Sequence, residues 1–230
     1  MLVRVDDFPH LSPKEFHGHL YFDDYKEKAL QWILPFEKHK IDYILGVTPL
    51  LIDESDIEFL NEHIKHGRIV MHGFDHSFAS WKILQSLNIP ITSTWNNGGE
   101  FVNWNRKELS IRYNLCNKYM KDILRYDENH FIPPFNAITQ NLLDFLNEET
   151  KVSTIHDTSI CNEQQNHNRF NYGNLNNMIA ISNKESADIK TVINNLTKKT
   201  KYIVLHWIFD YQNLDDYGTL AEHIRKINDE

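Results

Sequence analysis

The chain opens on LVRVDDFP at Leu2–Pro9, a short apolar run that ends in two adjacent carboxylates. The valines and the length of Leu2–Val5 are typical of a buried β-strand. Carboxylates at the end of such a strand are costly to bury without partners, and in extended backbone neighbouring side chains point to opposite faces. We therefore expect Asp6 and Asp7 to have different tasks. The residues alone leave open that one caps a turn while the other is solvated.

Six more apolar runs of strand length follow along the chain. They are Ile41–Val47, Arg68–Met71, His130–Pro133, Val152–Ile155, Met178–Ile181 and Tyr202–His206. Segments with helical spacing separate most of them: Tyr25, Ala29, Trp32, Ile33 and Phe36 form one apolar stripe, and Ile57, Leu60 and Ile64 form another after the acidic Asp53–Asp56. Further helices are expected at about 105–126, 138–148, 186–198 and 217–228.

This alternation predicts repeated βα units and a mostly parallel sheet, arranged as a closed or partly open barrel or as a doubly wound sheet. No solenoid repeat and no linker rich in Gly, Pro or Ser interrupts residues 1–230, so a single domain is expected. Both architectures place functional residues at the carboxyl ends of the strands. Those strand ends are where the chemistry of the chain should lie.

Composition excludes several classes of protein. With 41% hydrophobic residues among 230, the chain is too apolar to be disordered, and no stretch of about 18 apolar residues predicts a membrane span. The formal charge of −8 argues against nucleic acid or anionic lipid as the main partner. Cys116 and Cys161 are too few for a disulfide scaffold and lack metal-ligand spacing. The first residues lack an apolar signal core, so a cytoplasmic protein is expected.

Thirteen histidines are a high count for this length, and two of them, His72 and His76, follow the third predicted strand. If the backbone turns helically there, histidines at i and i+4 lie on one face and both reach a single cation. A strand-end aspartate would supply a third ligand; such an open set is typical of catalytic zinc, and cobalt, nickel and iron(II) also suit imidazole. The residues alone leave open that the spacing arises by chance. His10, His17 and His19 offer a rival ligand set.

Two other strand ends carry candidate groups. Pro133 and Pro134 fix a turn before Phe135 that could aim a backbone N–H at a substrate oxygen, or could serve the turn alone. His206 ends the very apolar last strand, where a histidine is either a catalytic acid or a satisfied core residue. Because the carboxyl ends of parallel strands share one face, these groups are expected to converge with the acidic pair.

The acidic pair, the His-x-x-x-His pair, the Pro-Pro turn and the final Leu-His step occur in the chain order of one family. From Val3 to about Trp207 the sequence resembles the polysaccharide deacetylases, the NodB-homology type of carbohydrate esterase, and especially their short cytoplasmic relatives in bacterial surface-polysaccharide loci. The resemblance implies a distorted (β/α) barrel of about seven mostly parallel strands. It also implies one divalent metal ion, with zinc favoured over cobalt, nickel and iron, and removal of an N-acetyl group from a sugar or sugar conjugate.

Matched motif by motif, the resemblance assigns roles in this chain. It implies Asp6 as general base, Asp7, His72 and His76 as metal ligands, Phe135 after Pro134 as a backbone oxyanion donor, and His206 as general acid. Expected substrate contacts are Pro134, Asn136, Trp95, Glu100 and Asp157. Most of the recognition is expected from the long segments Phe8–Asp23, Gly73–Asn103 and Ser159–Asn177, because loops beyond about 12–15 residues are usually functional or disordered.

The sequence also departs from the family pattern. The family's usual Gly after the acidic pair is Phe8 here, and Gly73 stands where Ser or Thr is common in the second motif. The third motif lacks its usual Arg, having Phe131 or Ile132 instead, and Phe135 replaces its usual Tyr. The fourth motif is not recognisable, and His156-Asp157 is a candidate substitute. These gaps keep two alternatives open: an inactive relative that binds carbohydrate or metal, and a metal-dependent hydrolase of another amide. A phosphoesterase is less favoured, since the chain has no Gly-rich phosphate loop.

Overall fold

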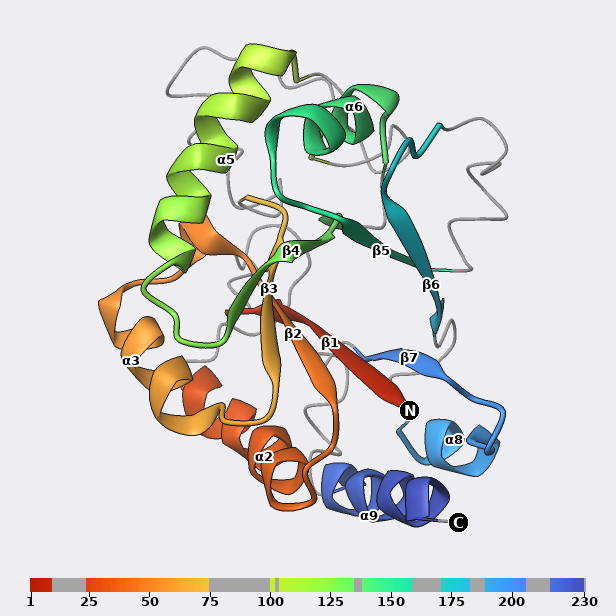
Figure 1. The fold of residues 1–230 in the computed structure, drawn as a ribbon. Coiled ribbons are helices and arrows are strands. Elements are labelled where there is room, and N and C mark those ends of the chain that lie inside the picture. Colours follow the sequence, from red (N-terminus) through yellow and green to blue (C-terminus); the bar gives the residue numbers. More distant parts are fainter. Residues whose placement is uncertain are drawn as a thin grey trace, which may run out of the picture.

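The computed structural model describes residues 1–9, 24–74, 100–101, 104–134, 138–158, 171–182, 189–205 and 216–229. In these residues seven parallel strands lie in chain order and close into a barrel, because β7 pairs with β1 (Figure 1). The strands are β1 Leu2–Phe8, β2 Tyr43–Val47, β3 Arg68–His72, β4 Tyr126–Ile132, β5 Thr154–Thr158, β6 Asn176–Ser182 and β7 Tyr202–Leu205. The barrel that the family resemblance implied is confirmed, and the doubly wound sheet is excluded.

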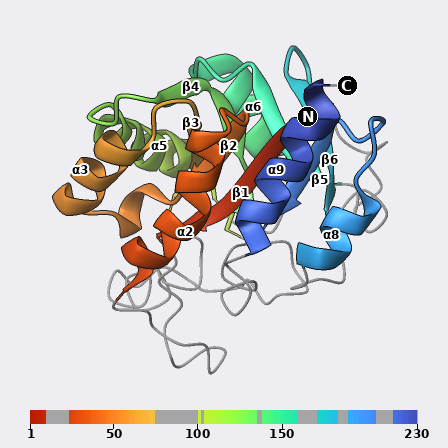
Figure 2. The ribbon, with the colours of Figure 1, turned by 90° about the horizontal axis from the view of Figure 1, so that it is seen from below.

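Helices cover the outside of the barrel (Figure 2). They are α2 Tyr25–Lys38, α3 Glu54–His63, α5 Arg106–Met120, α6 Gln140–Glu149, α8 Ile189–Asn195 and α9 Asp216–Asp229, with a short 3-10 helix η1 at Pro49–Leu51. The side chains of Asp53 and Asn105 cap α3 and α5 by accepting backbone N–H groups of the first turn, which have no partner within the helix. None of the described helices is long and apolar enough to cross a membrane.

The strand side chains alternate between two cores. On the outer face, Val3 belongs to a large buried cluster that includes Trp32 of α2. On the inner face, Ile44, Val70 and Ile132 form a separate small cluster inside the barrel. Parallel strands that are buried on both faces are nearly continuous apolar runs in the sequence, which is why the sequence predicts all seven of them.

Several strands are longer than the sequence predicts, among them β6, which spans Asn176–Ser182 rather than Met178–Ile181, and most informatively β1 and β4. β1 continues beyond Val5 through the two aspartates to Phe8, and β4 begins at Tyr126 rather than His130. The preceding helix correspondingly ends at Met120 rather than near 126. The first residues of β4 are polar and only partly buried, so apolar content gives no signal there. In both strands, polar residues extend a run that hydrophobicity alone would end.

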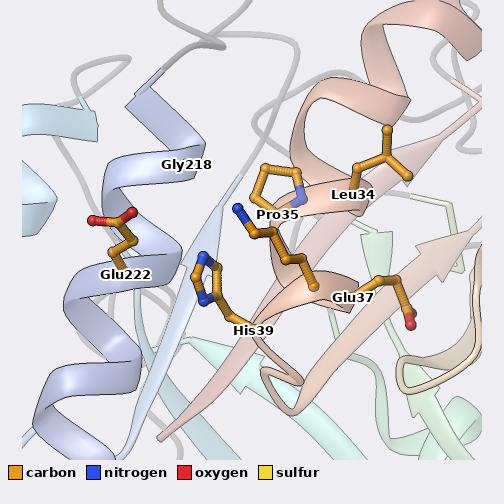
Figure 3. Close-up of a pocket in the computed structure, with 7 residues that line it drawn as sticks. Leu34, Pro35, Glu37, His39, Gly218 and Glu222 are labelled. Carbon is orange, nitrogen blue, oxygen red and sulfur yellow. The ribbon is translucent and has the colours of Figure 1, made fainter.

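The two chain ends lie side by side, as Figure 2 shows, and the Met1 ammonium donates to the Asn228 side chain at 3.1 Å. A surface hollow of about 510 Å³ lies between α2 and α9 (Figure 3). Its lining consists of Leu34, Pro35, Glu37, Lys38, His39, Gly218 and Glu222. All of these belong to the outer helices or their ends, and none is a predicted site residue.

Glu37 fastens the segment between α3 and β3. Its carboxylate accepts the Tyr43 hydroxyl at 2.7 Å and the backbone N–H groups of Lys65, His66 and Gly67 at 2.9–3.2 Å. Partial burial raises the pKa of the Glu37 carboxyl, but these donors outweigh it and hold the pKa below its usual value. The ionised carboxylate is therefore a structural anchor.

We expect Glu37→Ala to lower the free energy of unfolding by about 2 kcal/mol, because several backbone donors lose a charged acceptor at a partly solvated site. Glu62→Ala removes a mostly exposed carboxylate and should change stability by less than about 0.5 kcal/mol. Urea denaturation of both variants measures the difference. Equal losses in the two variants would contradict the anchoring role.

Candidate active site

A bulge in β1 re-aims the acidic pair. The register of β1 on β2 shifts between Val5 and Phe8, so that Asp6 and Asp7 together stand opposite Gly46. Asp7 has a positive φ of 73°, a left-handed conformation that Asp adopts more readily than most residues. Bulges of this kind turn a side chain away from the direction that regular alternation would give it.

Gly46 makes the space in which the acidic pair meets His72. A Cβ on Gly46 would stand 3.0 Å from Asp6 Oδ1 and 3.2 Å from the Cβ of His72, and Asp7 Oδ1 lies 3.0 Å from His72 Nε2. Asp6, Asp7 and His72 are 1%, 9% and 3% exposed. The expectation that the two aspartates point to opposite faces is therefore wrong, because the left-handed backbone at Asp7 brings both to the side of His72.

His72 connects Asp7 to the backbone of β4. Its Nδ1 lies 3.2 Å from the carbonyl oxygen of Ile132, and its Nε2 faces Asp7. Since a carbonyl oxygen can only accept, Nδ1 carries the hydrogen. In a neutral ring the Nε2 lone pair then faces a carboxylate oxygen at 3.0 Å. Two acceptors at this separation need a cation between them, either a proton or a metal ion.

The turn after β3 is held by Glu100, which is 4% exposed. Glu100 Oε1 accepts the backbone N–H of Phe74 at 2.9 Å. Gly73 has a φ of 64°, and a Cβ there would stand 2.2 Å from Pro134 Cγ and 2.3 Å from Glu100 Oε2. Glycine is therefore required where the family commonly has Ser or Thr. Glu100 and Pro134, two expected substrate contacts, come together directly beside the histidine end of β3.

Arg4 is the partner of Asp6. Fully buried inside the barrel, it donates to Asp6 Oδ2 from Nε at 3.0 Å and from Nη2 at 2.6 Å. Both of these bonds go to Oδ2, and the other carboxylate oxygen, Oδ1, is the one that lies beside Gly46. Burial lowers the pKa of the Arg4 guanidinium, but the charges of Asp6 and Tyr202 and the hydrogen bonds to both together outweigh this effect, and the pKa is raised. The two charges stabilise each other in a place where either one alone would be costly.

A chain of hydrogen bonds continues from Arg4 through the barrel interior. The guanidinium hydrogen-bonds Tyr202. The Tyr202 hydroxyl lies 2.5 Å from His156 Nδ1, and His156 Nε2 lies 2.7 Å from His130 Nδ1. Arg4 can only donate, so the Tyr202 oxygen accepts from it and directs its own hydrogen to His156. His156 and His130 are then both neutral rings with the hydrogen on Nε2.

The surroundings favour this neutral state. Burial lowers the pKa of His156 well below its ordinary value, and the positive charge of Arg4 acts in the same direction. Burial also lowers the pKa of His130, although Asp127 partly opposes it. The pKa of the Tyr202 hydroxyl is raised to about 12 by burial, so it keeps its hydrogen at neutral pH. Protonation of His156 would place a second donor against that hydroxyl and break the direction of the chain.

Part of the predicted site lies outside the described residues. This holds for His76, Phe135, Asn136, His206 and Trp95, and for the rival ligands His10, His17 and His19. Asp157 lies in β5, where it pairs with Ile179 of β6. Within the described ranges no group of three or more His, Cys, Asp or Glu side chains that could hold a metal ion is found. Asp7 and His72 are the two expected ligands that the structure describes.

Four residues of this site were missed by the sequence reasoning, although two of them carry a signal. The four are Gly46, Arg4, Tyr202 and His130. A glycine inside a predicted strand, such as Gly46, often marks a close approach of other groups. Arg4 is the one charge within the first apolar run, and its spacing from Asp6 puts both on the same face of the strand. No local pattern indicates the contact between Tyr202 and His156, because it joins strands that are 46 residues apart.

The seven-stranded parallel barrel places two aspartates and a histidine together at the carboxyl ends of its strands, the end where barrels of this kind carry their functional residues. No protein-family model matches the sequence, and no curated protein matches it. Solved structures do match. The family 4 carbohydrate esterase domain of a xylanase from the hindgut metagenome of Trinervitermes trinervoides has a TM-score of 0.56 at 10% identity, over 99% of this chain and 82% of that one.

Two further solved structures from the same esterase family are also similar to this chain. A family 4 acetyl xylan esterase from Clostridium thermocellum, solved with a cobalt ion, has a TM-score of 0.52 at 10% identity, over 96% of this chain and 85% of that one. A mutant of a family 4 pseudoenzyme from Bacillus anthracis has a TM-score of 0.52 at 10% identity, over 100% of this chain and 62% of that one. The chain thus has the fold of the family 4 carbohydrate esterases, and the resemblance to polysaccharide deacetylases is confirmed at the level of the fold.

We expect Gly46→Ala to lower the free energy of unfolding by about 1–3 kcal/mol. The added methyl group would press on the side chains of Asp6, His72 and Ile132, which lie 3.0–3.2 Å from its position. Gly218→Ala is the matched control, because a Cβ there meets nothing within 4 Å and alanine favours the helix. Urea denaturation should show the first variant destabilised and the second unchanged or stabilised. The reverse order would contradict the packing described for Gly46.

The pH dependence of stability tests the neutral state of His156. Its pKa is lowered in the folded protein, so in acid the unfolded chain, with a histidine pKa of about 6.5, binds more protons. Stability is therefore full above about pH 6.5 and falls below it, by up to about 1.4 kcal/mol per pH unit for this residue. His156→Gln should flatten the fall, while His66→Gln, at an exposed position, should keep it. Parallel pH profiles for all three proteins would refute the assignment.

Proposed function

We propose that the protein is a metal-dependent hydrolase that removes an N-acetyl group from a sugar or sugar conjugate in surface-polysaccharide metabolism. The observation that carries this proposal is the meeting of Asp7 and His72 beside Asp6 at the carboxyl ends of the barrel strands. The fold is that of the family 4 esterases. The fold alone does not decide activity, and for that reason the site residues carry the argument.

The donor set fits a divalent cation. Two ligands bound at about 2.0–2.1 Å to one tetrahedral zinc ion lie about 3.3–3.4 Å apart, a few tenths of an ångström more than the 3.0 Å between Asp7 Oδ1 and His72 Nε2. The bond of His72 Nδ1 to a backbone carbonyl oxygen orients the ring in the way common for metal-bound histidines. His76 is proposed as the third ligand. Zinc is favoured for the imidazole and carboxylate donors, and cobalt, nickel and iron are alternatives.

A divalent cation at this place would lower the pKa of water and polarise an acetyl carbonyl group. Asp6 is proposed as the base that takes the proton of the attacking water, through the Oδ1 oxygen that lies beside Gly46. Arg4 holds the other oxygen, Oδ2, and so fixes the direction of the carboxylate. Asp6 is thereby kept in place for proton transfer while Asp7 faces His72.

The remaining steps are proposed for residues beyond the described ranges. The backbone N–H of Phe135, after the Pro133-Pro134 turn, would stabilise the oxyanion. His206 would protonate the departing amine, which is otherwise a poor leaving group. Trp95 and Asn136, which also lie beyond these ranges, are proposed as substrate contacts, together with Asp157 of β5 and with Glu100 and Pro134 beside the turn after β3.

An inactive relative that binds carbohydrate or metal is the second candidate. It is favoured by the altered third motif and the missing fourth motif, and the similarity to a structure whose protein is described as a family 4 pseudoenzyme is consistent with it. Such a relative would have the same metal site as the first candidate but would release no acetate. A hydrolase of another amide would keep both the metal and the base.

Variants of the proposed ligands separate metal binding from turnover. We expect Asp7→Ala and His72→Ala to lower zinc affinity by about a hundredfold or more. Asp6→Asn should keep the zinc and lower the rate of acetate release by about 10²–10⁴-fold. His66→Ala, at an exposed histidine, serves as the control that retains both properties.

Equilibrium dialysis with zinc followed by elemental analysis measures the first property. Acetate release from N-acetylhexosamine oligomers and conjugates, with zinc, cobalt and nickel in turn, measures the second. Full turnover by Asp6→Asn would end the assignment of the base, and zinc affinity unchanged in Asp7→Ala would end that of the ligand. Zinc binding without acetate release from any of these substrates would favour the inactive relative.

A further inference from the structure

Exposed apolar side chains gather on one helix of the barrel's outer layer. Of the five large apolar side chains that are exposed among the described residues, four lie on α5 or in the turn after it: Ile111 (59%), Leu115 (45%), Tyr119 (47%) and Leu124 (79%). The first three follow one another at intervals of four residues and so form one stripe along the helix. Figure 1 shows α5 at the outer edge of the molecule.

The inner face of α5 is already used. Leu109, Tyr113, Cys116 and Met120 are buried against the barrel, and they recur with the spacing that gives an amphipathic helix its core side. A second apolar stripe that points away from this core has no packing role among the residues that the structure describes. Exposed apolar patches of this kind mark interaction surfaces more often than isolated exposed residues do.

Basic residues accompany the stripe on a chain whose net charge is −8. Lys107, Lys118 and Lys121 are exposed on the same helix and its cap, and Arg125 follows Leu124. Helix α5 carries four basic residues and one acidic residue, whereas α3 carries four acidic residues and neither Lys nor Arg. We define the α5 ridge as Ile111, Leu115, Tyr119 and Leu124 with Lys107, Lys118 and Lys121. Its partner should be both anionic and apolar.

A second copy of the chain does not meet this requirement in a symmetric contact. An antiparallel contact centred on Leu115 would place Lys118 against Arg112 of the second copy, and a parallel contact would place Lys118 against Lys118. Symmetric interfaces repeat each residue on both sides, so the basic side chains would repel one another. The ridge is also a convex helix face rather than a groove. A convex face suits a soft partner, such as a lipid surface, that can deform around it.

We propose that the α5 ridge docks the protein on an anionic lipid surface. The apolar side chains would enter the interface between headgroups and acyl chains, while the lysines would contact the acidic headgroups. The acidic net charge argues against such a partner for the molecule as a whole, but membrane attraction acts within about a Debye length of the surface. The local charge of the α5 ridge, and not the net charge of the chain, therefore decides whether the protein is attracted to the lipid surface. This inference does not depend on the proposed enzymatic function.

Co-sedimentation of the full chain with vesicles tests the proposal. We expect binding to vesicles of phosphatidylglycerol and phosphatidylcholine in equal parts, and none to phosphatidylcholine alone. Lys107→Gln, Lys118→Gln and Lys121→Gln together should weaken binding about a hundredfold, since each lysine contributes about fivefold. Ile111→Ser with Leu115→Ser should weaken it about tenfold or more. Salt at roughly 1 M, where the Debye length is about 3 Å, should release the protein.

The matched control is the lysine cluster before β7, Lys198, Lys199 and Lys201, which has no exposed large apolar side chain near it in the described part of the chain. Changing these three lysines to Gln should leave binding unchanged, and melting curves should show that every variant is folded. The proposal is overturned if the chain does not bind the anionic vesicles, or if the control lysines matter as much as those of the ridge. It is also overturned if sedimentation velocity shows a dimer that Ile111→Ser and Leu115→Ser abolish, because a second copy then covers the ridge.

Discussion

Two neighbouring carboxylates are buried at the end of β1, and each needs a partner of opposite charge or a hydrogen-bond donor. Unpaired burial of such groups costs several kcal/mol. Asp6 obtains Arg4 from its own strand, and Asp7 obtains His72 from β3. The bulge and the left-handed backbone at Asp7 make this division possible. The rest of the site is arranged around these two pairs.

The first pair depends on the closed barrel. Arg4 lies on β1, while its hydrogen-bond partner Tyr202 lies on β7, and these strands are neighbours because the barrel closes between them. Tyr202 leads on to His156 of β5 and His130 of β4. The barrel interior therefore has a polar part, which is this chain of hydrogen bonds, and an apolar part, which is the cluster around Ile44.

Sequence patterns predicted most of the fold, since strands buried on both faces and helices with one apolar stripe leave clear periodicity. They predicted the meeting of Asp7 with His72 through the rule that parallel strands end on one face. They failed where side-chain direction depends on one backbone angle, as at Asp7, and where contacts join distant strands, as between Tyr202 and His156. The polar first half of β4 was missed because partial burial leaves no apolar signal.

The central claim is that the gap between Asp7 and His72 is a metal site and not merely a hydrogen bond. An anomalous difference map from crystals grown with zinc tests it most directly. The account predicts a peak about 2.0–2.2 Å from both Asp7 Oδ1 and His72 Nε2. A map with full zinc occupancy elsewhere, for example at His17 and His19, and no density between Asp7 and His72 would contradict it.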